Sequence, residues 1–186
     1  MSTTSSLESR VGLLEREQVT AEIATIYDKL LAERGVVPNM FKALANVPGL
    51  AIGFASLLKP LMSDAELPAL YKELVATHIA WLNDCEYCVS SHRYLAKLRG
   101  ATPEQIAAIE NFEAGPFSER EKAGFRYAVQ LHAGGNAIDD AAWKAVSSHF
   151  TQNELLELTA VAAAFEFFPR FNSSLRIPVT SLPEGY

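Results

Sequence analysis

The stretch ELVATHIAWLNDCEYCVSSHRYL, residues 73–95, contains both cysteines of the chain and two of its four histidines. Apolar residues at helical spacing precede the cysteines and predict a helix over residues 64–83. Asn83, with Glu86 three residues later, offers a capping box for a following helix, and Asp84 is a competing cap. Either cap starts the following helix at the first cysteine. The stretch therefore predicts two helices joined by a tight break.

Helix start and stop signals recur along the rest of the sequence. Gly35 is placed to end a helix over residues 14–34, and a short helix is expected between Pro38 and Pro48. Four Ser or Thr residues precede Glu or Gln by three positions, as in capping boxes: Ser63 with Glu66, Thr102 with Gln105, Ser118 with Glu121, and Thr151 with Glu154. These patterns predict an all-α helical bundle of eight or nine helices.

The bundle is expected to form a single domain over residues 1–186, because no linker or repeat interrupts the helical pattern. Residues 1–15 are expected to be a flexible N-terminal segment. Residues 172–186 are polar and contain several prolines, and they predict a C-terminal arm that lies on a neighbouring subunit.

Composition excludes several classes of function. The net charge of −6 argues against a nucleic-acid-binding face, which would need clustered Lys and Arg. The sequence shows no secretory leader and no uninterrupted apolar run that could cross a membrane, so a cytoplasmic protein is expected. Thiols are kept reduced in that compartment. The cysteine pair is therefore interpreted as catalytic, redox-active or metal-binding.

Cys85, Cys88 and His92 share one face of the predicted second helix, because their spacings are three and four residues. Two thiols one turn apart can form a disulfide, and the positive end of the helix dipole favours the thiolate. In a continuous helix Glu73 and Cys85 would lie about 18 Å apart. The break at residues 83–84 lets Glu73 approach His92, and an acid behind an imidazole that faces a thiol forms a proton relay.

These residues also match a family pattern. Glu73, Cys85, Cys88 and His92 reproduce the signature E-x11-C-x2-C-x3-H of the AhpD-like, carboxymuconolactone decarboxylase superfamily, and the sequence resembles that superfamily over residues 36–110. The segments VPNMFKALANVPGL and ELVATHIAWLNDCEYC contribute to the resemblance. This chain carries Tyr87 where the best-known member has a histidine next to the second cysteine.

The resemblance implies a thiol-dependent alkylhydroperoxidase with no organic or metal cofactor. Cys88 would attack the peroxide, Cys85 would resolve it as a disulfide, and Glu73 with His92 would form the relay. The implied partners are a peroxide substrate and an external dithiol, either a small thiol or a lipoyl or thioredoxin-like protein. The family also implies a homo-oligomer, either a dimer, a trimer or a hexamer. Tyr87 and His78 are candidate auxiliary residues.

Several alternatives to a peroxidase remain open. The two cysteines and His92 could be part of a zinc site, with His78 or Glu73 as the fourth ligand. A carboxymuconolactone decarboxylase-like enzyme is a second alternative, although those branches work without a cysteine pair. The third is a redox-sensing protein without rapid turnover. The cysteines could also be inert core residues, since free Cys packs as a small hydrophobe.

Overall fold

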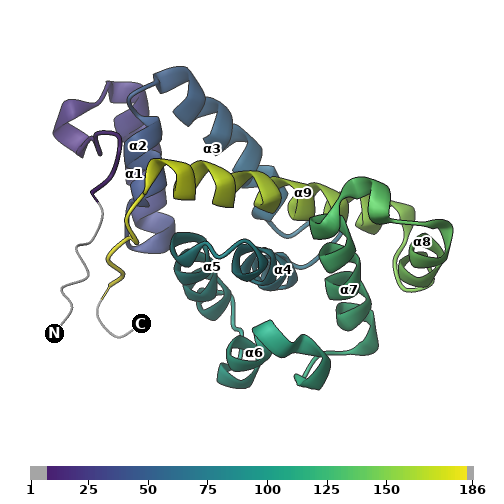
Figure 1. Ribbon diagram of the computed structural model, residues 1–186. Coiled ribbons are helices and arrows are strands. Elements are labelled where there is room, and N and C mark those ends of the chain that lie inside the picture. The colour runs from purple at the N-terminus through teal and green to yellow at the C-terminus, as the bar shows by residue number, and fades with distance from the viewer. Residues whose placement is uncertain (1–7, 184–186) are drawn as a thin grey trace, which may run out of the picture.

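The computed structural model describes residues 8–183, and within this range it contains α-helices, short 3-10 helices and no strand (Figure 1). Nine α-helices occur in the described residues, which confirms the all-α prediction. Their bounds are α1 Ala21–Arg34, α2 Asn39–Leu44, α3 Pro48–Met62, α4 Ala69–Leu82, α5 Glu86–Leu98, α6 Pro103–Ala108, α7 Glu119–Ala133, α8 Asp140–Ser147 and α9 Gln152–Leu175. The 3-10 helices are η1 Arg16–Gln18, η2 Ile109–Ala114 and η3 Gly135–Ala137. Within the described range no helix is both long and apolar enough to span a bilayer.

Helix α4 forms the centre of the bundle. It packs against α5, α7 and α9, and Figure 1 shows it surrounded by these three helices. Eleven of its residues are buried, including the polar side chains Lys72, Glu73, Thr77 and His78. A helix buried nearly all round is expected to be apolar. The acid and base side chains that α4 carries into the interior therefore need partners there.

Several predicted helix ends are confirmed, although the helix expected over residues 14–34 begins only at Ala21, after the cap residue Thr20. Gly35 ends α1 in the left-handed conformation (φ +69°) that glycine adopts without strain. The capping boxes at Thr102, Ser118 and Thr151 are all present.

The predicted cap at Ser63 is wrong, because Ser63 ends α3 and α4 begins only at Ala69. Pro68 explains the delay, since the residue before a proline is disfavoured in helical conformation. Asp64 takes over the capping role, and its Oδ1 accepts a hydrogen bond from the Ala69 amide at 2.7 Å.

Both ends of the described chain pack on the chain's own helices. The amide of Arg10 donates to the carbonyl of Leu175 at 2.9 Å, within the segment expected to be flexible. At the other end, α9 continues through Leu175, so the C-terminal arm starts later than expected. Thr180 accepts a hydrogen bond from the Asn39 amide at 3.0 Å, which holds the arm on α2 of the same chain. Residues 1–7 and 184–186, also assigned to these two segments, lie outside the described residues.

Candidate active site

The first cysteine starts α5 by capping it. Asp84 occupies a left-handed conformation (φ +51°) in the break between α4 and α5. Cys85 follows as the N-cap residue, and its Sγ accepts a hydrogen bond from the Cys88 amide at 3.3 Å. The prediction that Asn83 or Asp84 caps this helix is therefore wrong. Asn83 instead ends α4, where its side-chain amide donates to the Ile79 carbonyl at 3.0 Å.

Cys85 and Cys88 form a disulfide, with their Cα atoms 5.3 Å apart. Each residue is only 2% exposed. The one-turn spacing read from the sequence thus allows the two sulfurs to pair, as predicted. Because both residues are buried, only a small molecule or a narrow group could reach the sulfurs from solvent.

Glu73 and His92 are brought together by the fold of α5 back onto α4. The carboxylate Oε2 of Glu73 accepts a hydrogen bond from Nδ1 of His92 at 2.7 Å. The other oxygen, Oε1, accepts one from Nε of Arg99 at 3.2 Å. Glu73 is 1% exposed, so these two partners offset the cost of burying its charge.

This geometry also orients the histidine ring. With Nδ1–H bound to Glu73, the neutral ring has its acceptor at Nε2. The edge of the Phe165 ring contacts the imidazole, with centroids 4.5 Å apart and planes at 83°. His92 is therefore fixed both by hydrogen bonding and by packing.

A small internal cavity of about 50 Å³ lies beside these groups. Cys88, His92 and Glu73 line it, whereas Cys85 does not. Its remaining walls are mainly apolar, and they include Phe41 from α2, Leu58 and Met62 from α3, and Phe165 and Phe168 from α9. Of the two disulfide-bonded cysteines, Cys88 therefore borders the space where a reactant could sit.

Asn172 is a site residue that the sequence did not indicate. It lies on α9, 84 residues from Cys88, and its Nδ2 donates to the Cys88 sulfur at 3.5 Å. The residue is buried and lines the cavity, and its Oδ1 has no hydrogen-bond partner within the described structure. No pattern in the sequence marks this asparagine, because its partner comes from a distant helix.

Arg34 is the second residue that the sequence did not indicate. It closes α1 and lines the same cavity as the relay. Burial lowers the pKa of its guanidinium, and the nearby carboxylate of Glu73 opposes that effect. Arg34 thus adds positive charge next to a buried acid.

The two auxiliary candidates lie in different places. Tyr87 lines the cavity, and its hydroxyl accepts a hydrogen bond from the Met40 amide at 3.0 Å, which ties α5 to α2. Burial raises the pKa of Tyr87, so the side chain is a neutral phenol.

His78 does not line the cavity; its Nδ1 donates to the Ile109 carbonyl at 2.9 Å, and its ring packs against Phe112. Burial lowers the pKa of His78.

The zinc alternative would need at least three converging ligands. Across residues 8–183 no three His, Cys, Asp or Glu side chains converge in a way that could hold a metal ion. His78, one of the two suggested fourth ligands, is instead hydrogen-bonded to the chain at η2.

Solved structures define the fold class. An alkylhydroperoxidase AhpD core, an uncharacterized peroxidase-related protein from Ralstonia eutropha JMP134, superposes with a TM-score of 0.86 at 22% identity, covering 93% of both chains. An uncharacterized peroxidase-related protein from Silicibacter sp. TM1040 gives 0.88 at 20% identity, covering 97% of this chain and 96% of that one. A variant of the debrominase Bmp8, solved in complex with 2,3,4-tribromopyrrole, gives 0.84 at 18% identity over 94% of both chains. The protein therefore has an AhpD-like fold, and this fold occurs with more than one described activity.

The sequence is also similar to a known family. Residues 48–130 match the carboxymuconolactone decarboxylase family, so this part of the chain resembles that family. Among curated proteins, the uncharacterized protein YnjA of Escherichia coli K12 is 29% identical over 117 residues, which cover 62% of this chain. The match spans 64% of YnjA, just under two thirds of its length.

Proposed function

We propose that this protein is a thiol-dependent hydroperoxidase. The observation that carries the proposal is the placement of Cys88 on the same small cavity as the Glu73–His92 pair, with Cys85 bonded to it. A nucleophile, a base and a group that orients the base are the parts that nucleophilic catalysis needs. The cysteine behind the nucleophile supplies the resolving thiol.

The reaction starts from the reduced protein. Nε2 of His92 accepts the proton of the Cys88 thiol, and Glu73 stabilises the resulting imidazolium. The thiolate attacks one peroxide oxygen, the O–O bond breaks, and the departing alkoxide takes a proton to become an alcohol. Cys88 is left as a sulfenic acid. The Cys85 thiol then displaces hydroxide, which leaves as water, and forms the disulfide.

An external dithiol completes the cycle by thiol–disulfide exchange. The sum is one hydroperoxide and one dithiol converted to one alcohol, one water and one oxidised dithiol. The two buried sulfurs favour a small dithiol, or a narrow group carried on a larger protein, over a broad protein surface as the reductant. A homo-oligomer is also proposed, on the basis of apolar side chains exposed on α3 and α9.

The reaction of the debrominase is a second candidate, because the fold is shared and phenylalanines line the cavity. The size of the cavity argues against it. A volume of about 50 Å³ is well below the range of about 300–1,000 Å³ that is typical of small-molecule sites. It suits a peroxide group better than a ring that carries three bromines.

Peroxide consumption by the full-length protein, with a small dithiol in excess, tests the proposal. We expect repeated turnover with hydrogen peroxide or tert-butyl hydroperoxide, together with a disulfide that appears and disappears in intact-mass spectra. Release of bromide from a brominated pyrrole without peroxide turnover would favour the second candidate. A single oxidation without turnover at any dithiol concentration would indicate a redox sensor and contradict the proposal.

A further inference from the structure

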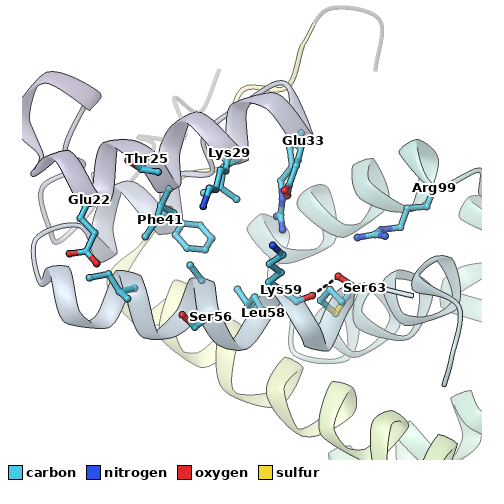
Figure 2. A pocket seen from close by; sticks show the side chains of 16 residues that line it. Glu22, Thr25, Lys29, Glu33, Phe41, Ser56, Leu58, Lys59, Ser63 and Arg99 are labelled. Atoms are coloured by element: carbon cyan, nitrogen blue, oxygen red, sulfur yellow. Dashed lines mark hydrogen bonds between the residues drawn. The ribbon is translucent and has the colours of Figure 1, made fainter. Parts of the chain in front are cut away.

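A larger groove lies between α1 and α3, on the outer side of the internal cavity. Its volume is about 520 Å³, which falls within the range of about 300–1,000 Å³ typical of small-molecule sites. Figure 2 shows side chains from both helices directed into it. The groove is lined both by polar side chains and by apolar ones, among them Leu30, Phe41, Ile52 and Leu58.

The groove and the internal cavity share part of their walls. Arg34, Phe41, Leu58 and Met62 line both spaces. These four side chains lie between the groove and the internal cavity that Cys88 lines, and three of them are apolar. The internal cavity is small and the groove is the larger space beside it, so the remainder of a larger substrate would lie in the groove.

The charged lining of the groove is mainly positive. It contains Lys29, Arg34, Lys59 and Arg99 against Glu22 and Glu33, in a protein whose net charge is −6. Figure 2 shows Lys29 on α1 and Lys59 on α3, on opposite walls of the groove.

The two lysines are available to a ligand. Within the described chain, the ion pairs that use a lysine involve Lys42, Lys72 and Lys122, and leave Lys29 and Lys59 without an acidic partner. Two unpaired ammonium groups that face one groove favour an anion.

We propose that the groove binds hydroperoxides that carry a carboxylate, such as those of fatty acids. The carboxylate would lie between Lys29 and Lys59, the hydrocarbon part would lie on Phe41, Leu58 and Met62, and the hydroperoxide would reach Cys88. The inference rests on the proposed function and names the substrate class of that site. In this reaction one hydroperoxy acid and one dithiol are converted to one hydroxy acid, one water and one oxidised dithiol.

A matched pair of substrates tests the proposal on the reduced full-length protein. The two substrates are an 18-carbon fatty-acid hydroperoxide and its methyl ester, both below their micelle concentrations. We expect the acid to have a kcat/KM about 3–10-fold higher than the ester. This is the gain in binding expected from two solvent-exposed charge pairs, one to each lysine. The preference should weaken as salt is added, because these charges are accessible to solvent.

The variant K29Q/K59Q should bring the ratio of the two kcat/KM values, acid to ester, close to one, mainly through KM. The control variant K144Q should keep the wild-type ratio, because Lys144 lies on α8 and does not line the groove. Equal rates for acid and ester in the wild type, or an unchanged ratio in the double variant, would overturn the proposal.

A binding measurement separates the two levels of inference. The matching hydroxy acid, which cannot react, should bind the wild type more tightly than K29Q/K59Q by a similar factor in calorimetry. If no hydroperoxide is turned over but this difference in binding persists, the peroxidase assignment fails and the anion site stands. If turnover occurs and no difference in binding is seen, the anion site fails alone.

Discussion

Oε2 of Glu73 lies 2.7 Å from Nδ1 of His92, although 19 residues and a helix break separate the two residues. The pairing exists because the left-handed turn at Asp84 lets α5 fold back along α4. It places a buried carboxylate behind an imidazole that faces the Cys88 cavity. The geometry makes Glu73 the first residue to test.

Glu73→Gln should slow oxidation of the Cys88 thiol by about 10²–10⁴-fold, the usual contribution of general acid–base catalysis. The amide keeps the shape of the side chain but cannot stabilise a charged imidazolium. Stopped-flow oxidation by hydrogen peroxide between pH 6 and 9 measures the effect. Glu113→Gln is the matched control. It neutralises an exposed acid that is paired with Arg126, and Glu113 does not line the cavity. Equal rates for the two variants would remove Glu73 from the mechanism.

The two cysteines should give different products when each is replaced. Cys88→Ser should abolish peroxide consumption, because Cys88 borders the cavity and Cys85 does not. Cys85→Ser should allow one oxidation that stops as a sulfenic acid on Cys88. Labelling with a sulfenic-acid reagent and peptide mapping identifies the oxidised residue. A label on Cys85 in the Cys88→Ser protein, with none on Cys88 in the other variant, would reverse the assignment.

Asn172 should act as a positioning residue for the reactive sulfur. Asn172→Ala removes the donor that lies 3.5 Å from Cys88, and we expect oxidation to slow by about tenfold, which corresponds to one hydrogen bond of roughly 1.4 kcal/mol. Asn172→Asp places a negative charge beside the sulfur and disfavours the thiolate. In that variant the rate–pH profile should move to higher pH. A purely structural residue would lower the melting temperature without moving this profile.

The buried ion pair between Lys72 and Glu157 should be important for stability. Lys72 is 1% exposed, and its ammonium also donates to the Ser63 carbonyl. Glu157→Gln should lower the free energy of unfolding by about 3–5 kcal/mol, because it leaves a buried charge without its counter-charge. Urea denaturation measures the change. Glu110→Gln, which affects the more exposed pair with Arg93, should change stability by less than about 1 kcal/mol.

The protein should form a homo-oligomer through α3 and α9. Leu50 and Leu57 on α3 and Phe167 on α9 are exposed, and Phe54 stacks on Phe167 with ring centroids 5.6 Å apart. Exposed apolar side chains gathered over two neighbouring helices mark an interaction surface. Light scattering should give a mass that is a multiple of 20.4 kDa.

Phe167→Glu should reduce the mass of the assembly. Leu156→Glu is the control, because Leu156 is exposed near the other end of α9. A wild-type mass near 20.4 kDa at all working concentrations would contradict the expectation.

The sequence by itself determined the elements of this protein. Helical periodicity and local caps such as Thr102, Ser118 and Thr151 depend on residues three or four positions apart, so they can be read without the fold. The same local spacing predicted Cys88 and His92 on one side of α5, whereas Cys85, expected on the same face, is the N-cap residue before the helix. A prediction from local spacing was wrong where a neighbouring residue disfavoured the helix, as Pro68 did before the start of α4.

Only the tertiary structure decided what surrounds the cysteines. Helix packing brought Glu73 to His92, Asn172 to Cys88, and Arg34 to the cavity, and none of these contacts leaves a periodic signal in the sequence. It also decided that Cys88 rather than Cys85 borders the cavity, since that depends on how α5 is rotated against α4 and α9. Contacts between distant segments follow from the sum of side-chain packing over the whole bundle, which no local pattern encodes.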